Sequence, residues 1–161
     1  MPKWKEDIAH FELYRILKNR ILENLEYRGI EFCDVIPEYN IKNERADLVI
    51  FFKTNSIEPQ KPFIVIEVKR GKMNRNPASN NRTVEQAKKY ATALDAPYYI
   101  ITDAEKISWF KLSNNKMTAS EGLITNKIRP GIPTEKQVPN VSIEKWIEIL
   151  KEIVSDYQDG K

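Results

Sequence analysis

Apolar positions change their spacing along the chain, and each spacing predicts a different element. From about residue 5 to residue 27 they recur at helical intervals opposite a charged face, which predicts an amphipathic helix. Gly29 follows, at a place typical of a helix end. The apolar stripe of this helix is expected to contain Ile8, Phe11, Tyr14, Ile16, Leu17, Ile21, Leu22 and Leu25.

Five short runs rich in β-branched and aromatic residues predict strands. One is a continuous apolar run around Leu48–Phe52, typical of a central strand. Another reads Phe-Ile-Val-Ile-Glu-Val-Lys and becomes polar only at its last residues. The predicted strands are residues 30–39 (interrupted by Pro37), 45–53, 63–69, 98–102 and 106–112, the last two as a hairpin around residues 103–105.

Two further helices complete the pattern. Thr83 is expected to cap a helix over residues 84–94, and Ser142 one that runs to about residue 157. The order of elements predicts an α/β fold in which helices flank a central mixed β-sheet, an αβββαβ core with an extra C-terminal helix. We expect one domain over residues 1–161, with its core at about 5–112 and a C-terminal extension at 113–161.

Composition limits the chemistry that is open to the chain. Hydrophobic residues make up 41% and charged residues 30% of the 161 residues, which is typical of a globular protein. Cys33 is the only cysteine and His10 the only histidine, so a disulfide framework and a cysteine zinc site are excluded, and both residues are expected to be structural. Any metal must therefore have oxygen ligands, which favours Mg²⁺, Mn²⁺ or Ca²⁺.

Charge is distributed unevenly. The whole chain carries only +3, but residues 61–90 contain eight lysines and arginines against two glutamates. Such a segment is either a solvated surface or a surface that binds phosphates. The N-terminus is charged where a signal peptide would be apolar, and no apolar stretch reaches the length of a membrane span, so a cytoplasmic protein without a membrane partner is expected.

Ionisable residues stand at the ends of two predicted apolar strands. Asp47 begins one, while Glu67 and Lys69 end the other and, being two apart, point to the same face. A structural salt bridge of Glu67 with Lys69 or Arg45 would explain the charges. Two carboxylates at one point repel each other unless a cation lies between them, so a Mg²⁺ site is the other explanation, with the Val68 carbonyl as a further ligand.

A metal held by carboxylates at a strand end suits phosphodiester hydrolysis. It lowers the pKa of a bound water and neutralises charge on the phosphate. Lys69 would orient or deprotonate the attacking water, or else stabilise the charge of the transition state. The sequence leaves the choice between these roles open.

Three short motifs in this order resemble the PD-(D/E)XK nuclease superfamily: Arg45-Ala46-Asp47, Glu67-Val68-Lys69, and Gln86 with Tyr90 four residues later. They are most similar to the nuclease domain at the N-terminus of type I restriction enzyme motor subunits, over about residues 11–112. Ala46 stands where the superfamily motif has proline. The resemblance implies a restriction-endonuclease-like fold and a Mg²⁺-dependent endonuclease of restriction or repair type that cleaves DNA, with Mn²⁺ as a substitute. No phosphate-binding loop of a motor domain is present, so a separate motor or specificity subunit is implied.

The resemblance also implies roles for further residues. Glu12 would be an additional metal ligand, with Glu23 and Glu38 as alternatives. Gln86 would contact the metal-bound water or the phosphate, Tyr90 would pack over the site, and Arg45 would support it. Basic residues would contact DNA phosphates: Arg70, Lys72, Arg75, Arg82, Lys88 and Lys89.

Alternatives to a DNA-cutting enzyme stay open. The same fold without turnover would be a nucleic-acid-binding or assembly module, and an RNA-directed nuclease is a weaker alternative. Nucleases that cut both strands are often dimers, and the C-terminal helix with Trp146 and Ile149 is a candidate for a homodimer contact.

Overall fold

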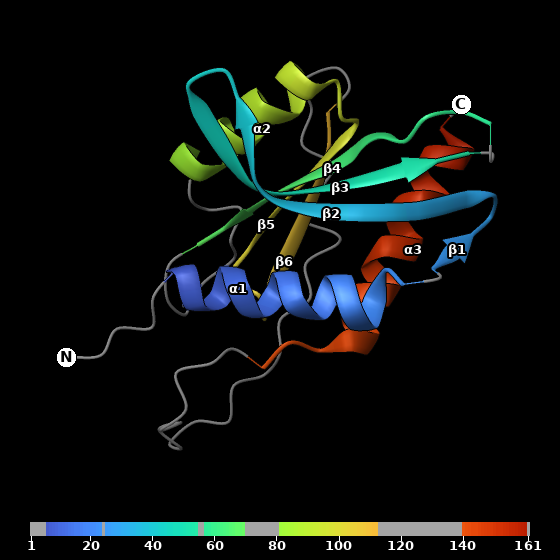
Figure 1. The fold of residues 1–161 in the computed structure, drawn as a ribbon, viewed down its shortest axis with the longest axis horizontal. Coiled ribbons are helices and arrows are strands. Elements are labelled where there is room, and N and C mark those ends of the chain that lie inside the picture. Colours follow the sequence, from blue (N-terminus) through green and yellow to red (C-terminus); the bar gives the residue numbers. More distant parts are fainter. Residues whose placement is uncertain (1–5, 24, 55–56, 70–80, 113–139, 161) are drawn as a thin grey trace.

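A six-stranded β-sheet with helices on both faces forms the centre of the molecule in a computed structural model (Figure 1). The structure describes residues 6–23, 25–54, 57–69, 81–112 and 140–160. The strands lie in the sheet in chain order. The elements are α1 (Glu6–Ile16), a short π-helix η1 (Leu17–Ile21), β1 (Glu26–Tyr27), β2 (Ile30–Ile41), β3 (Glu44–Lys53), β4 (Lys61–Val68), α2 (Asn81–Leu94), β5 (Tyr98–Thr102), β6 (Ile107–Lys111) and α3 (Ile143–Asp159).

The sheet is mixed, as the pattern of elements predicts. Strands β1 to β4 form an antiparallel meander, and β5 pairs with β6 as the expected hairpin. Strands β4 and β5 are parallel, and α2 lies between them in the chain. At the β5–β6 turn the Asp103 carboxylate accepts hydrogen bonds from the amides of Glu105 and Lys106. Strand β4 thus lies between β3, to which it is antiparallel, and β5, to which it is parallel.

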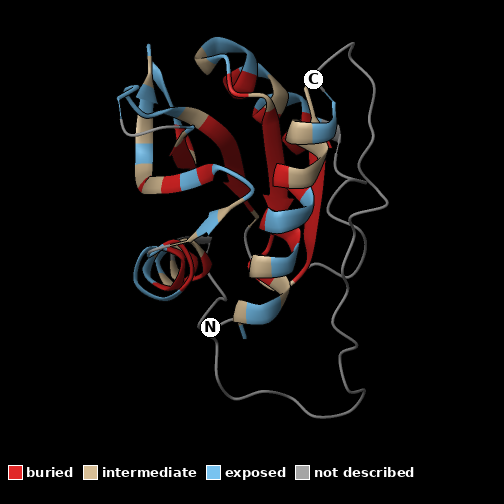
Figure 2. Cartoon of the chain, turned by 90° about the vertical axis from the view of Figure 1, so that its right-hand side faces the viewer, coloured by how far each residue is buried: buried red, intermediate tan, exposed pale blue. Residues whose placement is uncertain are grey.

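Alternation along the strands produces two cores, one on each face of the sheet. In β3, Leu48 and Ile50 pack in the core beneath α1, η1 and α3, while Val49 and Phe51 pack in the core beneath α2. Figure 2 shows the buried side of the helices turned toward the buried strands. Both faces of β3 and β4 are covered, which explains their continuous apolar sequences.

Helix α3 is part of the main core. Trp146 and Ile149 are fully buried within the chain, and the Trp146 indole N–H donates to the Ala104 carbonyl at 3.2 Å. The predicted homodimer contact through these two side chains is therefore wrong, because they have no surface to offer a second copy. The cap by Ser142 is confirmed, since its hydroxyl accepts from the Lys145 amide at 3.3 Å.

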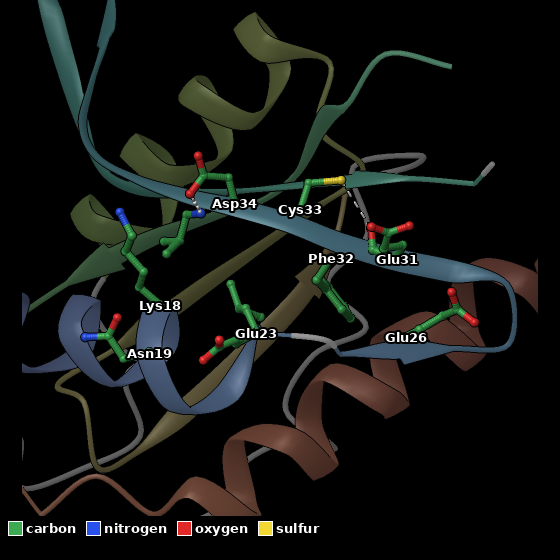
Figure 3. A pocket seen from close by; sticks show the side chains of 10 residues that line it. Lys18, Asn19, Glu23, Glu26, Glu31, Phe32, Cys33 and Asp34 are labelled. Atoms are coloured by element: carbon green, nitrogen blue, oxygen red, sulfur yellow. Dashed lines mark hydrogen bonds between the residues drawn. The ribbon is translucent and has the colours of Figure 1, made fainter. Parts of the chain in front are cut away.

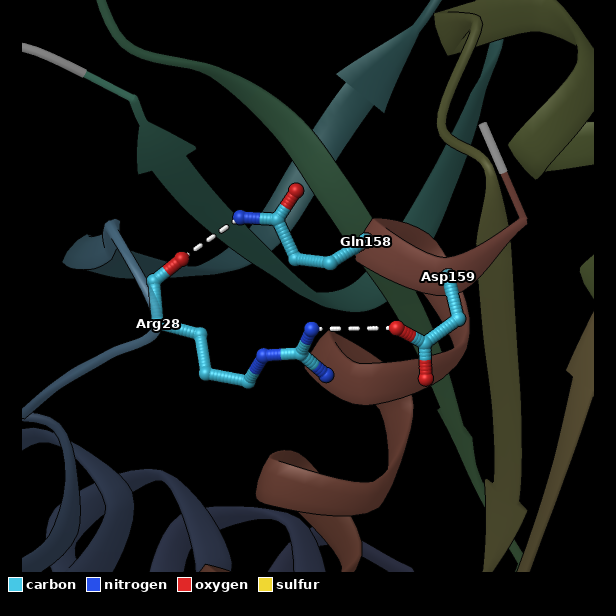
Figure 4. A network of polar contacts seen from close by, with 3 residues as sticks. All are labelled: Arg28, Gln158 and Asp159. Atoms are coloured by element: carbon cyan, nitrogen blue, oxygen red, sulfur yellow. Dashed lines mark hydrogen bonds and ion pairs between the residues drawn. The ribbon is translucent and has the colours of Figure 1, made fainter.

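The first helix is shorter than its apolar spacing predicts. It ends with η1, and Glu26 and Tyr27 form β1, which turns into β2 through a two-residue hairpin loop at Arg28 (φ +49°) and Gly29 (φ +85°). Figure 4 shows how this loop is held from α3: Arg28 pairs with Asp159 at 3.0 Å, and Gln158 donates to the Arg28 carbonyl at 2.6 Å. These long-range contacts favour a hairpin over a further helical turn.

Two smaller expectations about the helices are also wrong. Phe11 of α1 is 65% exposed, so it lies outside the apolar stripe that packs on the sheet. Thr83 is buried inside α2, because the helix begins at Asn81 rather than after Thr83. Within the described ranges, no helix is both long and apolar enough to cross a bilayer.

Candidate active site at the ends of β3 and β4

The two predicted carboxylates meet where β3 and β4 stop pairing. The last paired residues are Leu48 and Ile66, and beyond them side chains replace the backbone ladder. The Asp47 amide donates to Glu67 Oε2 at 3.0 Å, and the Val68 amide donates to Asp47 Oδ2 at 2.8 Å. This reciprocal pair of bonds brings together two carboxylates that are 20 residues apart in the chain.

Burial differs among the three residues of the motif. Glu67 is 5% exposed and, by strand alternation, lies with Val65 on the face that α2 covers. Asp47 and Lys69 are half-buried. Strand β4 ends at Val68, one residue before the predicted end, and the Lys69 amide donates to the Thr102 carbonyl of β5 at 2.7 Å. The backbone of Lys69 is therefore anchored to the neighbouring strand at the same end of the sheet.

Helix α2 approaches the site through Tyr90. Its hydroxyl accepts a hydrogen bond from the Gln86 amide nitrogen at 2.9 Å. Burial raises the pKa of Tyr90; the Gln86 hydrogen bond acts in the opposite direction, and the negative charge of Glu67 raises the pKa further. Tyr90 is thus close enough to Glu67 for the carboxylate to affect its pKa. Gln86 is exposed.

Helix α1 contacts the site through a residue for which no function is predicted. The His10 ring nitrogen Nε2 lies 2.8 Å from the backbone carbonyl oxygen of Asp47. Glu12 instead forms an ion pair with Arg15 at 2.9 Å on the helix surface. No local signal could reveal His10, because a single histidine on a helix has no spacing to read and its partner lies 37 residues away.

The alternatives to Glu12 are placed elsewhere. Glu38 pairs with Arg45 at 3.3 Å, and Glu23 lines a separate cavity. Within the described part of the chain, no group of three or more His, Cys, Asp or Glu side chains is arranged to hold a metal ion. The structure therefore brings Asp47 and Glu67 together but adds none of these three glutamates to them, and the choice of a further ligand stays a prediction.

The basic residues predicted to contact DNA are only partly described. Arg82 and Lys89 of α2 are exposed and Lys88 is half-buried, whereas Arg70, Lys72 and Arg75 lie outside the described residues. Lys89 pairs with Glu44 at 2.9 Å, which links α2 to the start of β3, next to the turn from β2. A cavity of about 440 Å³ lies there, lined by Tyr90 and by residues of the turn.

A second cavity of about 680 Å³ lies between η1 and β2 (Figure 3). It contains none of the predicted site residues except Glu23. Carboxylates predominate among its charged groups, so it does not suit a phosphate. The charged lining residues are Lys18, Glu23, Glu26, Glu31 and Asp34.

Comparison with known proteins identifies a family for this chain. A family model described as "Type I restriction enzyme R protein N terminus (HSDR_N)" matches residues 29–124 of the 161. The chain belongs to this family. The matched region contains both strand ends and helix α2, so the restriction-enzyme relationship implied by the three motifs is confirmed at that level.

A solved structure has a similar fold. The structure of the type IIG restriction endonuclease BpuSI matches with a TM-score of 0.53 and 22% sequence identity over 96% of this chain. The chain spans 17% of the length of that protein. A search of curated proteins finds no matching relative.

Proposed function

We propose that the chain is a divalent-metal-dependent nuclease with a PD-(D/E)XK-type site that hydrolyses DNA phosphodiester bonds, as an endonuclease of restriction or repair type. The observation that carries the proposal is the reciprocal hydrogen bonding that holds Asp47 against Glu67 and Val68 at one end of the sheet. Membership in the restriction-enzyme R-protein family supports it, because this site lies inside the matched region.

The donor set fits Mg²⁺, with Mn²⁺ as a substitute. Mg²⁺ usually takes one or two protein carboxylates and keeps several waters, so Asp47, Glu67 and the Val68 carbonyl are sufficient ligands. Each carboxylate also accepts a hydrogen bond from a backbone amide, which fixes its position at the strand end. A metal bound there would supply an activated water and neutralise charge on the phosphate.

The remaining groups of the site have complementary tasks. Lys69, anchored by its backbone to β5, would orient or deprotonate the attacking water or stabilise charge on the phosphoryl oxygens. The Glu67 carboxylate is held by the Asp47 amide, so its orientation is set before a substrate arrives. Gln86 is exposed beside Tyr90, where its amide would contact the phosphate or its water.

DNA would approach along the surface on which α2 carries its basic residues. Arg82, Lys88 and Lys89 would contact phosphates, together with Arg70, Lys72 and Arg75 of the preceding segment. Contacts of this kind give affinity that is independent of sequence and falls with salt. A motor or specificity partner would add sequence recognition and any coupling to translocation.

The test is cleavage of supercoiled and single-stranded DNA in Mg²⁺ or Mn²⁺ by the wild type, Asp47→Asn and Lys69→Met. Both variants should lose cleavage by about 100-fold or more, as expected for loss of a metal ligand or of transition-state stabilisation. Lys61→Met is the matched control, because Lys61 is an exposed lysine at the other end of the same strand. It should cut like the wild type.

Other results would contradict the proposal in distinct ways. Cleavage that survives in Asp47→Asn would place the activity elsewhere or in a contaminant. A wild type that binds DNA but neither cuts it nor binds Mn²⁺ would identify a nucleic-acid-binding module. If RNA competes better than DNA for the site, the chain would be a nuclease with the same chemistry that acts on RNA.

A further inference from the structure

The backbone of Asp47 is bonded in an unusual way for a residue inside a strand. In the register of β2 with β3, the paired residues on either side of it are Pro37 with Leu48 and Tyr39 with Ala46. Between them Glu38 lies opposite Asp47 and has φ +49°, a conformation that residues other than glycine rarely adopt. On the β4 side the ladder ends one residue earlier, at Leu48 and Ile66.

Both backbone polar groups of Asp47 contact side chains. Its amide donates to Glu67 Oε2 at 3.0 Å, and its carbonyl lies 2.8 Å from His10 Nε2. A carbonyl can only accept, so Nε2 must carry the proton and donate. This donor comes from the only histidine of the chain.

We propose that His10 is a positioning residue for Asp47. By holding the carbonyl, His10 fixes the peptide plane that follows Asp47, and with it the direction in which the Asp47 carboxylate leaves the backbone. The Val68 amide holds the carboxylate at its other end, so His10 and Val68 together define where the carboxylate oxygens lie. His10 itself touches neither substrate nor metal in this account. The inference rests on the proposed nuclease function, since it assigns Asp47 as the group to be oriented.

Packing alone does not account for a histidine at this position. The neighbouring residues Ala9 and Leu13 are fully buried and attach α1 to the sheet, while His10 is only half-buried. His10 contributes one hydrogen-bond donor, which is directed at the Asp47 carbonyl. Side chains that orient a metal ligand typically contribute about 10- to 100-fold to activity or metal affinity.

The test compares Gln, Asn and Ala at position 10 in the full chain. The amide nitrogen of glutamine is as many bonds from Cα as Nε2 of histidine, whereas that of asparagine is one bond closer and falls short. His10→Ala and His10→Asn should lower kcat by roughly 10- to 100-fold and leave KM for DNA within about threefold. His10→Gln should restore kcat to within a few-fold of the wild type.

Several outcomes would overturn the proposal. His10→Ala that cuts like the wild type would show that Asp47 needs no such support. If kcat falls as much in His10→Gln as in His10→Ala, the hydrogen-bond donor at the Nε2 position does not explain the effect of His10 on kcat. A kcat loss that follows a matching loss of folded protein, measured by urea unfolding, would reduce His10 to a structural residue.

Mn²⁺ binding, followed by electron paramagnetic resonance, gives a readout that does not depend on cleavage. The dissociation constant should rise about 10-fold in His10→Ala and stay near the wild-type value in His10→Gln. If the wild type binds Mn²⁺ and cuts, and the Ala variant does both equally well, only the role of His10 has failed. If the wild type neither binds Mn²⁺ nor cuts, the nuclease function has failed and the role of His10 falls with it.

Discussion

Replacing Asp47 tests a structural and a catalytic role of the same side chain. Asp47 Oδ2 accepts the hydrogen bond of the Val68 amide at 2.8 Å, and Val68 is only 3% exposed, so water cannot easily replace that acceptor. Asp47→Asn and Asp47→Ala both remove the negative charge beside Glu67. Only asparagine retains a side-chain oxygen in reach of the Val68 amide. The difference between the two variants therefore isolates the hydrogen bond from the electrostatic change.

The expected size of that difference follows from the cost of a buried donor without an acceptor, about 1–3 kcal/mol. Asp47→Ala should thus have a free energy of unfolding about 1–3 kcal/mol lower than that of Asp47→Asn. In a domain of this size each kcal/mol corresponds to a change in Tm of about 2–4 °C. Both variants should be inactive as nucleases, because neither has the carboxylate that would ligate the metal.

Urea unfolding followed by circular dichroism measures the difference, with metal omitted so that ligand binding does not contribute. Equal slopes of free energy against urea would show that the two unfolding reactions are comparable. If the two variants differ by less than about 0.5 kcal/mol, the hydrogen bond to Val68 does not stabilise the strand end as argued. Cleavage that persists in either variant would refute the catalytic part.

Two further predictions concern stability away from the site. Gly29→Ala should lower the free energy of unfolding, measured by urea titration, by about 1 kcal/mol. Gly29 has φ +85°, and a Cβ there would lie 3.8 Å from Gln158 Nε2, which is an ordinary contact. The cost therefore comes from backbone strain and not from a clash. Gly29→Asn should cost less, and equal losses would contradict the strain argument. Burial raises the pKa of Tyr99 to about 12. The protonated side chain therefore contributes its full stability below about pH 10, the pKa of tyrosine in the unfolded chain. As pH rises from about 10 toward 12, the free energy of unfolding should fall by up to about 2–3 kcal/mol. Tyr99→Phe should show a smaller alkaline loss in pH-dependent unfolding, and an identical loss would place the titration at other groups.

The strands were predictable because their signal is local. Strand β5 has the predicted bounds, and β3 and β4 differ from their predicted bounds by one or two residues. Apolar runs of this length are buried on both faces wherever helices cover both sides of a sheet, and that holds here for β3 and β4. The position of Asp47 and Glu67 at neighbouring strand ends follows from the same pattern, since the two runs pair antiparallel.

Predictions of where the helices begin and end, and of which side chains are exposed, were less accurate, because long-range contacts decide these features. The spacing of Leu25 and Tyr27 continues the first helix, yet Tyr27 pairs with Ile30 in a hairpin that α3 holds through Arg28. Trp146 has the apolar character of an interface residue, but the core beneath the sheet buries it completely.

The amino-acid sequence by itself determined the mixed α/β architecture, the restriction-enzyme relationship and the pairing of Asp47 with Glu67, because strand periodicity and motif order are properties of neighbouring residues. Only the tertiary structure decided that the Val68 amide holds the Asp47 carboxylate and that His10 holds the Asp47 carbonyl. These bonds arise where the β3–β4 ladder ends. The packing of α1 and β4 against β3 decides which distant side chains and amides reach Asp47, and no local pattern in the sequence encodes that packing.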